Sequence, residues 1–372
     1  MDTHERINRI RLSRTPQIGP VTCQLLIARY KTASKAIDAV AELSAKGGRR
    51  ITPVSRQIVE QEIEASEKLG ASFLIWGDPD YPSHLARFSD APFVLSAIGH
   101  KHLVNKPGLG IVGARNASMN ACKLAHSYAR QIGNGGYTII SGLARGIDKA
   151  SHEGSLATGT IAVLANGLDH IYPADHEELF NQIAQQGLIL SERALGTKPN
   201  ARLFPARNRL IASLSRAVLI VEAARNSGSM ITAREAADRG VDVLAIPGSP
   251  LDPRSAGCNQ LIKDGAYLVQ SVDDIFAHIE NQGTLGTTET GDYTPYLEMD
   301  TEISSQQIDE LKDKLLECLS HDPISVDELA RFCHVSAGMI NAVILELELS
   351  GGIQRHYGNK VSRAIDMPQS ID

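Results

Sequence analysis

The hydrophobic positions of this chain follow different patterns in successive parts, and these patterns divide the 372 residues into domains. In the first part, apolar residues recur at helical spacing, at Ile7 and Ile10 and then at Leu25 and Leu26. The pattern is short and lacks the alternation of strands. We therefore predict a small helical domain over residues 1–72.

The turn between these two helical segments contains Gly19 and Pro20 and leads directly into an apolar helix. Such a turn resembles those of the helix-hairpin-helix and SAM-like domains. In some of these domains the backbone N–H groups of the turn contact a phosphate, whereas in others the module serves for docking or dimerisation. We favour docking or dimerisation for this domain.

From residue 73 to residue 280, short continuous apolar runs rich in β-branched residues alternate with helical patterns. This alternation is typical of a parallel sheet with helices on both faces, a Rossmann-like doubly wound α/β fold. The candidate strands are residues 109–112, 138–140, 161–164, 188–190, 218–221 and 243–246. In such a fold, ligands bind beyond the carboxyl ends of the strands.

Small and polar residues gather where these strands end. Glycine lets backbone N–H groups approach an anion, and serine hydroxyls add hydrogen-bond donors. The candidate contacts in these loops are Gly113, Arg115, Gly142, Arg145, Ser227, Gly228 and Ser229. One loop of this kind is common in α/β proteins, but several that converge on one edge predict a specific anion-binding face. The three residues 227–229 also fit a helix N-cap, which needs no ligand.

The window from Arg193 to Arg216 contains six Arg or Lys residues and no Asp or Glu, in a chain with a formal net charge of −6. Within it, Pro205 fits the first turn of a helix, and apolar residues follow at helical spacing. Its cations, amide and aromatic ring fit a phosphate chain that carries bases. The candidate contacts are Lys198, Arg202, Phe204, Arg207, Asn208 and Arg209, the last three at the helix start. In an alternative that stays open, Arg207 and Arg209 form structural ion pairs.

Residues 281–304 are predicted to form an acidic linker, since the stretch 282–310 carries seven acidic residues and no Lys or Arg. Residues 305–372 then show three amphipathic helical segments and a short pair of strands, which resembles a winged helix. The helix that reads DNA in such folds carries Glu346 and Glu348 here and no basic residue. We therefore expect this domain to contact protein, or duplex DNA weakly, rather than to read a sequence.

Composition narrows the class of protein further. The five cysteines are widely spaced and form no C-x-x-C pair, so they indicate neither a disulfide framework nor a zinc site. The N-terminal stretch is polar and no run approaches the roughly 18 apolar residues that span a bilayer, which favours a cytoplasmic protein without membrane contact. The run from Gly108 to Gly113 reads G-x-G-x-x-G, but Lys106 and Pro107 precede it where the dinucleotide fingerprint requires a strand. We therefore expect no NAD, no metal and no other cofactor.

Asp148, His152 and Glu192 lie near the same predicted edge, where they resemble an acid, a base and an orienting group. The sequence pairs no nucleophile with a base and shows no metal-ligand spacing. We therefore interpret these three residues as hydrogen-bonding braces of the loops. Tyr172 and Pro173 are interpreted as part of a turn.

The ordered motifs of the central region resemble those of the DprA/Smf family, the DNA-processing proteins of natural transformation. The motifs that carry the resemblance are GAR at 113–115, SGLARGID at 141–148, NGLDHIYP at 166–173, FPARNRLIASLS at 204–215, SGSMITAREA at 227–236, IPGSP at 246–250 and GCNQLIKDGA at 257–266. The resemblance implies a non-enzymatic protein that binds single-stranded DNA. It also implies that the protein protects incoming strands, helps to displace single-strand-binding protein and loads the RecA recombinase, usually as a homodimer.

The resemblance places the family's DNA-binding pocket at Arg115, the basic loop before Phe204, Phe204 itself and the helix start that follows. The chain departs from the family pattern at two positions. The family commonly has serine directly before the arginine of the first motif, where this chain has alanine, and many members have a basic residue at the position of Ala201. Arg202 and Lys198 are the two candidates to supply that charge.

The alternative function is that of an enzyme, because Rossmann-like nucleotide phosphoribohydrolases share this kind of fold. Their signature resembles P-G-G-x-G-T-x-x-E and contains a catalytic glutamate. This chain has Pro247-Gly248-Ser249-Pro250 and no such run. Binding of single-stranded DNA is therefore the function that we expect.

Overall fold

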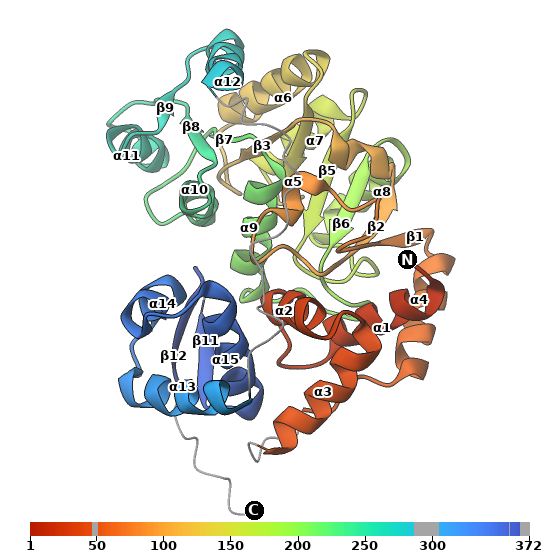
Figure 1. Cartoon of the computed structure of the whole chain (residues 1–372). Helices are drawn as coiled ribbons and strands as arrows, with labels where there is room; N and C mark the ends of the chain where they lie inside the picture. Colours follow the sequence, from red (N-terminus) through yellow and green to blue (C-terminus); the bar gives the residue numbers. More distant parts are fainter. Residues whose placement is uncertain (47–50, 286–304, 357, 365–372) are drawn as a thin grey trace, which may run out of the picture.

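The computed structural model describes residues 1–46, 51–285, 305–356 and 358–364. A helical N-terminal domain is followed by a nine-stranded sheet with helices on both faces and by a C-terminal domain of three helices and a small sheet (Figure 1). Most of the acidic linker predicted for residues 281–304 lies outside the described residues, and residues 281–285 form the end of a helix.

The N-terminal domain packs four helices around one hydrophobic cluster. Its second helix begins at Pro20 with Gly19 as the N-cap, where the missing N–H of proline costs no hydrogen bond. Leu12, Leu25 and Leu26 are fully buried in the cluster. The helices are α1 Thr3–Arg14, α2 Pro20–Tyr30, α3 Ala33–Lys46 and α4 Arg56–Lys68.

The central sheet has the strand order β1-β2-β6-β5-β4-β3-β7-β8-β9. The strands are β1 Ala71–Ile75, β2 Val94–Gly99, β3 Gly108–Val112, β4 Thr138–Ser141, β5 Thr160–Leu164, β6 Leu188–Ser191, β7 Ala217–Ile220, β8 Asp242–Ala245 and β9 Tyr267–Leu268. β2 is antiparallel to both β1 and β6, and all other pairs are parallel. From β3 the chain continues first toward β4 and later toward β7, so the topological switch point lies between β3 and β7.

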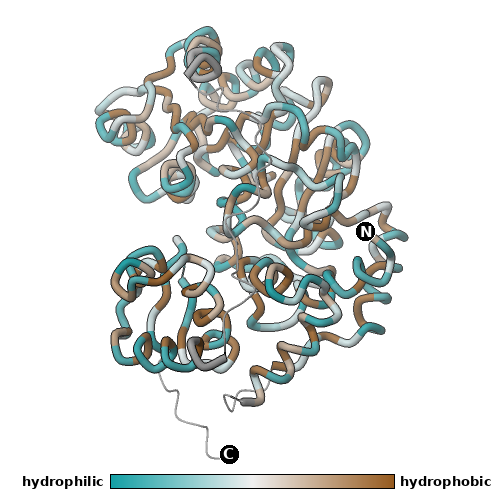
Figure 2. The backbone as a smooth tube through the Cα atoms, viewed as in Figure 1, coloured by the Kyte–Doolittle hydropathy of each residue, from teal (hydrophilic) through white to brown (hydrophobic). Residues whose placement is uncertain are grey.

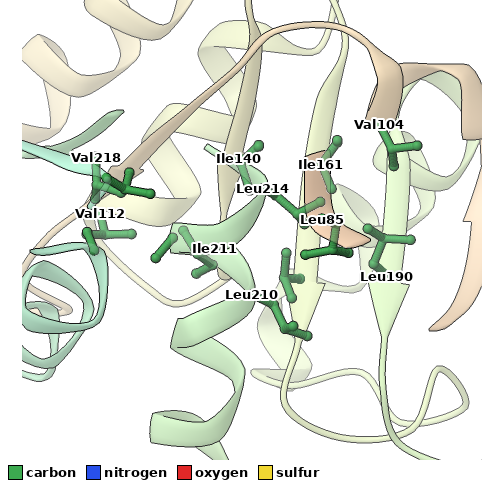
Figure 3. Packing of buried hydrophobic residues seen from close by; sticks show 14 of the residues in the cluster. Leu85, Val104, Val112, Ile140, Ile161, Leu190, Leu210, Ile211, Leu214 and Val218 are labelled. Carbon is green, nitrogen blue, oxygen red and sulfur yellow. The ribbon is translucent and has the colours of Figure 1, made fainter. Parts of the chain in front are cut away.

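Helices cover both faces of this sheet. They are α5 Ser83–Ala86, α6 Met119–Asn134, α7 Ile147–Ser155, α8 Glu177–Gln186, α9 Leu203–Leu214, α10 Gly228–Asp238, α11 Ala256–Lys263 and α12 Val272–Leu285, with short 3-10 turns η1 Lys101–Asn105, η2 Ala174–His176 and η3 Pro253–Ser255. On one face, Leu210, Ile211 and Leu214 of α9 pack against Ile140 and Ile161 of the strands (Figure 3). On the other face, α6, α7 and α12 form a second cluster with the same sheet. Because each helix has one face on the sheet and one face in solvent, hydrophobic and hydrophilic residues are interspersed along it (Figure 2).

The prediction of a Rossmann-like doubly wound sheet is confirmed. The six predicted strands correspond to β3 through β8, with ends that differ by at most one residue. The sequence prediction missed β1, β2 and β9. The first two form an antiparallel extension outside the βα alternation, and β9 consists of two exposed residues, Tyr267 and Leu268.

The C-terminal domain is a winged helix, as predicted. Its elements are α13 Ser305–Cys318, β10 Ile324–Ser325, α14 Val326–Cys333, α15 Ala337–Ser350, β11 Ile353–His356 and β12 Lys360–Arg363. The three strands pair in the order β10-β12-β11. Within the described part of the chain, no single helix is long and apolar enough to cross a membrane, and only α14 and α15 taken together reach that length, with a bend of 115° between them.

The third helix of this winged helix, α15, docks onto the N-terminal domain (Figure 1). Leu345 and Leu349 are buried in the same cluster as the side chains of α2 and α3. Glu346 of α15 accepts a hydrogen bond from Arg29 of α2 at 2.6 Å and pairs with Lys312 of α13 at 2.5 Å. Burial works to raise the pKa of Glu346, but the hydrogen bonds from Lys312 and Arg29 outweigh it and leave the pKa below its ordinary value.

The second carboxylate of α15 takes part in the same contact. Glu348 accepts a hydrogen bond from the Thr22 hydroxyl of α2 at 3.0 Å, and Arg355 of β11 donates to it at 3.2 Å. The acidic residues of α15 therefore bind neighbouring elements of this chain. The expectation that this domain contacts protein, or duplex DNA weakly, stays a prediction.

Candidate nucleic-acid interface

The aromatic ring of Phe204 lies in the first turn of α9, at the carboxyl edge of the sheet. The helix begins at Leu203, so Pro205 falls in its first turn as predicted. Arg115, in the loop after β3, places its guanidinium carbon 4.8 Å from the centre of the Phe204 ring. The Tyr172 ring lies 5.9 Å from the Phe204 ring, centre to centre. The structure thus joins three segments in one cluster of rings and a cation.

Three of the predicted cations are exposed in this cluster or in the segment that leads to it. Arg115 lies two residues after the strand-end glycine of β3, and its side chain is exposed. Lys198 and Arg202 are exposed in the loop before α9, six and two residues ahead of Phe204 in the chain. These three residues supply positive charge that solvent and a bound anion can reach.

Arg207 lies one turn further along α9, and it is buried rather than exposed. Its Nη1 donates a hydrogen bond to the carbonyl oxygen of Val163 at 2.7 Å, and its guanidinium carbon lies 5.8 Å from the centre of the Phe204 ring. Burial lowers the pKa of Arg207 to about 10, an effect that Asp148 opposes, so the side chain is still a cation at neutral pH. Its Nε has no hydrogen-bond partner among the residues that the structure describes.

Gly142 gives the Arg207 side chain the room it needs. A Cβ at position 142 would collide with Nη1 of Arg207. The Gly142 N–H donates to the Asp148 carboxylate at 3.2 Å, so this buried amide is directed into the loop. A phosphate contact from Gly142 stays a prediction; in this structure its N–H is bonded to Asp148 and the residue leaves room for Arg207.

Asp148 and His152 brace the loop after β4, which confirms the interpretation from the sequence. Asp148 accepts from the N–H groups of Gly142 and Ala144, and burial raises its pKa against the opposing charge of Arg207. His152 is fully buried, which lowers its pKa to about 3. Its Nε2 accepts from the Leu143 N–H at 3.3 Å, which assigns the proton to Nδ1, 2.8 Å from the Thr160 hydroxyl.

Arg209 also lies inside the protein. It donates to Glu192 at 2.5 Å and to the carbonyl oxygen of Asp90 at 2.6 Å. For Arg209, this is the structural ion pair that stayed open as the alternative to a DNA contact. Asn208 is buried as well. Residues 207–209 are buried because α9 packs on the sheet from its second turn onward. They therefore lie beneath the exposed surface around Phe204 and Arg115.

The remaining predicted residues lie at three places along the edge. Gly113 packs against Ile147, where a Cβ would collide. Arg145 is exposed and pairs with Asp175 at 3.1 Å. Ser227, Gly228 and Ser229 lie at the start of α10, beyond the switch point, where the Ser227 hydroxyl caps the helix as expected.

Tyr172 is the residue of this cluster that sequence reasoning missed, because it was assigned to a turn. The residue is 43% exposed and its ring lies beside Phe204. The available signal was its position: it belongs to the loop that follows β5, one of the strands whose ends line the edge.

In chain order the fold consists of a helical domain, a doubly wound sheet and a winged helix, with rings and cations gathered at the edge of the sheet that contains the switch point. These features define a three-domain protein of the Rossmann class. Models of three known domains match it in the same order. They are the DprA-like N-terminal HHH domain over residues 3–65, DNA recombination-mediator protein A over 72–280 and the DprA winged helix domain over 300–359.

Individual relatives agree with these matches. Protein Smf of Synechocystis sp. is 31% identical over 94% of this chain and 97% of its own length. The DNA processing protein DprA of Streptococcus pneumoniae is 43% identical over 55% of this chain and 72% of its own length. The chain belongs to the DprA/Smf family.

The solved structures that resemble this fold include those of two relatives named DNA processing protein A. The X-ray structure of DprA from Streptococcus pneumoniae has a TM-score of 0.64 at 32% identity and covers 74% of this chain and 98% of its own. A structure of DNA processing protein A from Helicobacter pylori, described by its single-stranded DNA binding mode, has a TM-score of 0.53 at 30% identity and covers 57% and 96%.

Proposed function

We propose that this protein binds single-stranded DNA at the carboxyl edge of its sheet, as a DNA-processing protein of transformation and recombination. The observation that carries the proposal is the Phe204 ring with the Arg115 guanidinium 4.8 Å from its centre, at the edge that contains the switch point. A ring and a cation together fit a strand that offers both bases and phosphates. The single-stranded DNA binding mode described for the Helicobacter pylori relative supports the same ligand.

In this proposal the exposed cations hold phosphates and the ring holds a base. Arg115 exchanges its contact with Phe204 for a phosphate oxygen, and Lys198 and Arg202 neutralise further phosphates. Phe204 then stacks on a base. Because stacking and phosphate contacts carry little sequence information, we expect weak discrimination between bases.

The buried residues of α9 act indirectly in this proposal. Arg207 and Arg209 fix the position of α9, and the charge of Arg207 lies close behind the Phe204 ring. Ser227, Gly228 and Ser229 at the start of α10 offer a further site for a phosphate on the other side of the switch point. Arg145 contributes its charge when it exchanges Asp175 for the strand.

We further propose the functions that the family resemblance implies. The protein shields incoming single strands, helps to displace single-strand-binding protein and loads RecA, as a homodimer and without catalytic activity of its own. In this proposal its place is the reducing cytoplasm. The five cysteines all lie in the part of the chain that the structure describes, and each is a free thiol there. The division into domains at about residues 72, 280 and 304 stays a prediction.

The proposal is tested by fluorescence anisotropy with labelled oligo-dT and a duplex control over a salt series. We expect preference for the single strand, and in Arg115→Ala a weaker affinity with a salt slope reduced by about one. Arg130→Ala is the matched control. It removes an exposed arginine near the C-terminus of α6, away from the carboxyl ends of the strands where we propose that DNA binds. Equal binding to duplex, or equal loss in the two variants, would contradict the proposal.

The alternative, a nucleotide phosphoribohydrolase, has a separate test. The catalytic glutamate of that signature is absent from the sequence, and the buried His152 is neutral and occupied by two hydrogen bonds. We expect no release of base from nucleoside monophosphates. Turnover that persists through purification would favour the enzyme instead.

A further inference from the structure

A groove of about 410 Å³ lies between the N-terminal domain and the loop that follows β6. Its apolar lining consists of Val54 and Ile58 from the N-terminal domain and of Ala194 and Leu195 from the loop. Pockets for small ligands have volumes of about 300–1,000 Å³, are mostly apolar with a few polar groups, and often lie between domains. The groove has these features, and the DNA contacts proposed above do not use it.

Three polar side chains, Arg14, Gln61 and Glu62, complete the lining of this groove. Arg14 Nε donates to both oxygens of the Glu62 carboxylate, at 3.0 and 3.2 Å, and the two side chains are only 8% and 10% exposed. Arg14 Nη2 is buried 3.0 Å from the same carboxylate, but it forms no hydrogen bond with any residue that the structure describes. Because a buried donor without a hydrogen bond is costly, a ligand with a carbonyl oxygen would be stabilised here.

The groove is connected to the surface that we propose for DNA. Arg14 Nη1 donates to the carbonyl oxygen of Glu192 at 3.1 Å, and the Glu192 side chain accepts from Arg209 of α9 at 2.5 Å. Leu195, in the wall of the groove, precedes the exposed Lys198 by three residues. Since three residues span at most about 10 Å, a phosphate bound at Lys198 brings the adjoining nucleotide within reach of the groove.

A nucleobase fits this groove in both shape and polarity. Its faces stack on apolar side chains, and its edge carries hydrogen-bond donors and acceptors. The Glu62 carboxylate only accepts hydrogen bonds, whereas the Arg14 guanidinium only donates them. Guanine presents two adjacent N–H donors, at N1 and N2, beside the acceptor O6, so one edge of this base satisfies both groups. Thymine has a single donor between two carbonyl oxygens, which a carboxylate repels.

We infer that this groove is a nucleobase subsite for the bound single strand, and that it prefers guanine to thymine. The inference rests on the proposed function. Phosphate and stacking contacts at the edge of the sheet read bases weakly, so the groove adds selectivity at one position of the strand.

The test measures anisotropy with three labelled oligonucleotides of equal length: oligo-dT, oligo-dT with dG at every fifth position, and oligo-dT with dA at those positions. The dA oligonucleotide controls for the stronger stacking of purines. We expect the wild-type chain to bind the dG oligonucleotide about tenfold more tightly than oligo-dT, and more tightly than the dA oligonucleotide.

Two variants of the full chain probe the groove. Glu62→Gln replaces the carboxylate by an amide of the same shape, and Ala194→Leu fills part of the groove. We expect both to lose most of the preference for dG while their affinity for oligo-dT stays within about twofold of the wild type. Glu67→Gln is the matched control, because it makes the same change of charge at an exposed position of α4 that does not line the groove.

The outcomes separate this inference from the proposed function. Equal wild-type affinity for the three oligonucleotides, or a preference for dG that both groove variants retain, would overturn the subsite while single-stranded DNA binding stands. If the wild-type chain binds none of the oligonucleotides, the proposed function fails and this inference with it. Thermal unfolding verifies that each variant is folded.

Discussion

Gly142 and Arg207 depend on one another, because the guanidinium of Arg207 occupies the space that any side chain at position 142 would need. The two residues come from different elements, the loop after β4 and the second turn of α9. Arg207 is fixed there by its hydrogen bond to Val163 and lies behind the Phe204 ring. The glycine of a strand-end loop thus helps to set the position of the binding surface.

We therefore predict that Gly142→Ala destabilises the protein, by about 1–3 kcal/mol, as overpacking of a filled interior does. Urea unfolding measures the loss. Gly228→Ala is the control, since a Cβ at position 228 meets open space. In the double variant Gly142→Ala/Arg207→Met the collision is removed, so we expect a smaller loss than the sum of the single variants. Additive losses would show that the two sites are independent.

Phe204→Ala is predicted to weaken binding to oligo-dT about tenfold or more, since a stacked base is worth on the order of 1–3 kcal/mol. The salt slope should stay near that of the wild type, because no phosphate contact is lost. Anisotropy titrations at several salt concentrations measure both quantities. Unchanged affinity would remove Phe204 from the site.

The buried His152 makes stability depend on pH. Its pKa is about 3 in the folded protein against an ordinary value of 6.5, so between these values the unfolded chain binds a proton that the folded protein does not. Stability therefore falls as the pH drops below 6.5, by up to about 1.4 kcal/mol per unit for this group. His152→Gln keeps a donor and an acceptor but does not titrate.

We expect the unfolding free energy of His152→Gln to be lower at neutral pH and to vary less than that of the wild type as the pH falls. Urea unfolding at a series of pH values measures this difference. His84, whose pKa burial lowers to about 4, titrates in both proteins and cancels in the comparison. Parallel pH profiles would refute the prediction.

The docking of α15 is predicted to fail in Leu349→Asp. Leu349 is 1% exposed and packs in the cluster of the N-terminal domain, so an aspartate there would bury an unpaired charge. Small-angle X-ray scattering should show a larger radius of gyration, and amide exchange should increase in α2. Phe332→Asp changes an exposed position of α14 and should alter neither. An unchanged scattering profile for Leu349→Asp would mean that other contacts hold the domains together.

Much of the fold could be predicted from the sequence. The strands β3 to β8 are short, mostly apolar runs separated by helical patterns, and such runs can be recognised along the chain without knowledge of tertiary contacts. The antiparallel strands β1 and β2 could not, since their pairing with β6 depends on contacts far apart in the chain. The domain boundaries at about residues 72, 280 and 304 remain predictions.

The candidate site was harder to predict than the fold. Residue types showed that cations gather in one window, but only the packing of α9 shows that Arg207 and Arg209 point into the protein while Arg115 and Arg202 are exposed. Tyr172 was missed because a turn and a binding loop have the same local sequence signals.

The contact between α15 and the N-terminal domain has a consequence for any other ligand of the winged helix. A ligand that needs the face of Leu345 and Leu349 binds only those molecules in which that face has been vacated, so its measured dissociation constant is the intrinsic one divided by the vacated fraction. If about one molecule in a hundred is open, the ligand binds about a hundredfold more weakly than it would to the isolated domain. The N-terminal helices therefore compete with such a ligand for the same face of α15. Because they belong to the same chain, their local concentration does not change with the concentration of the protein.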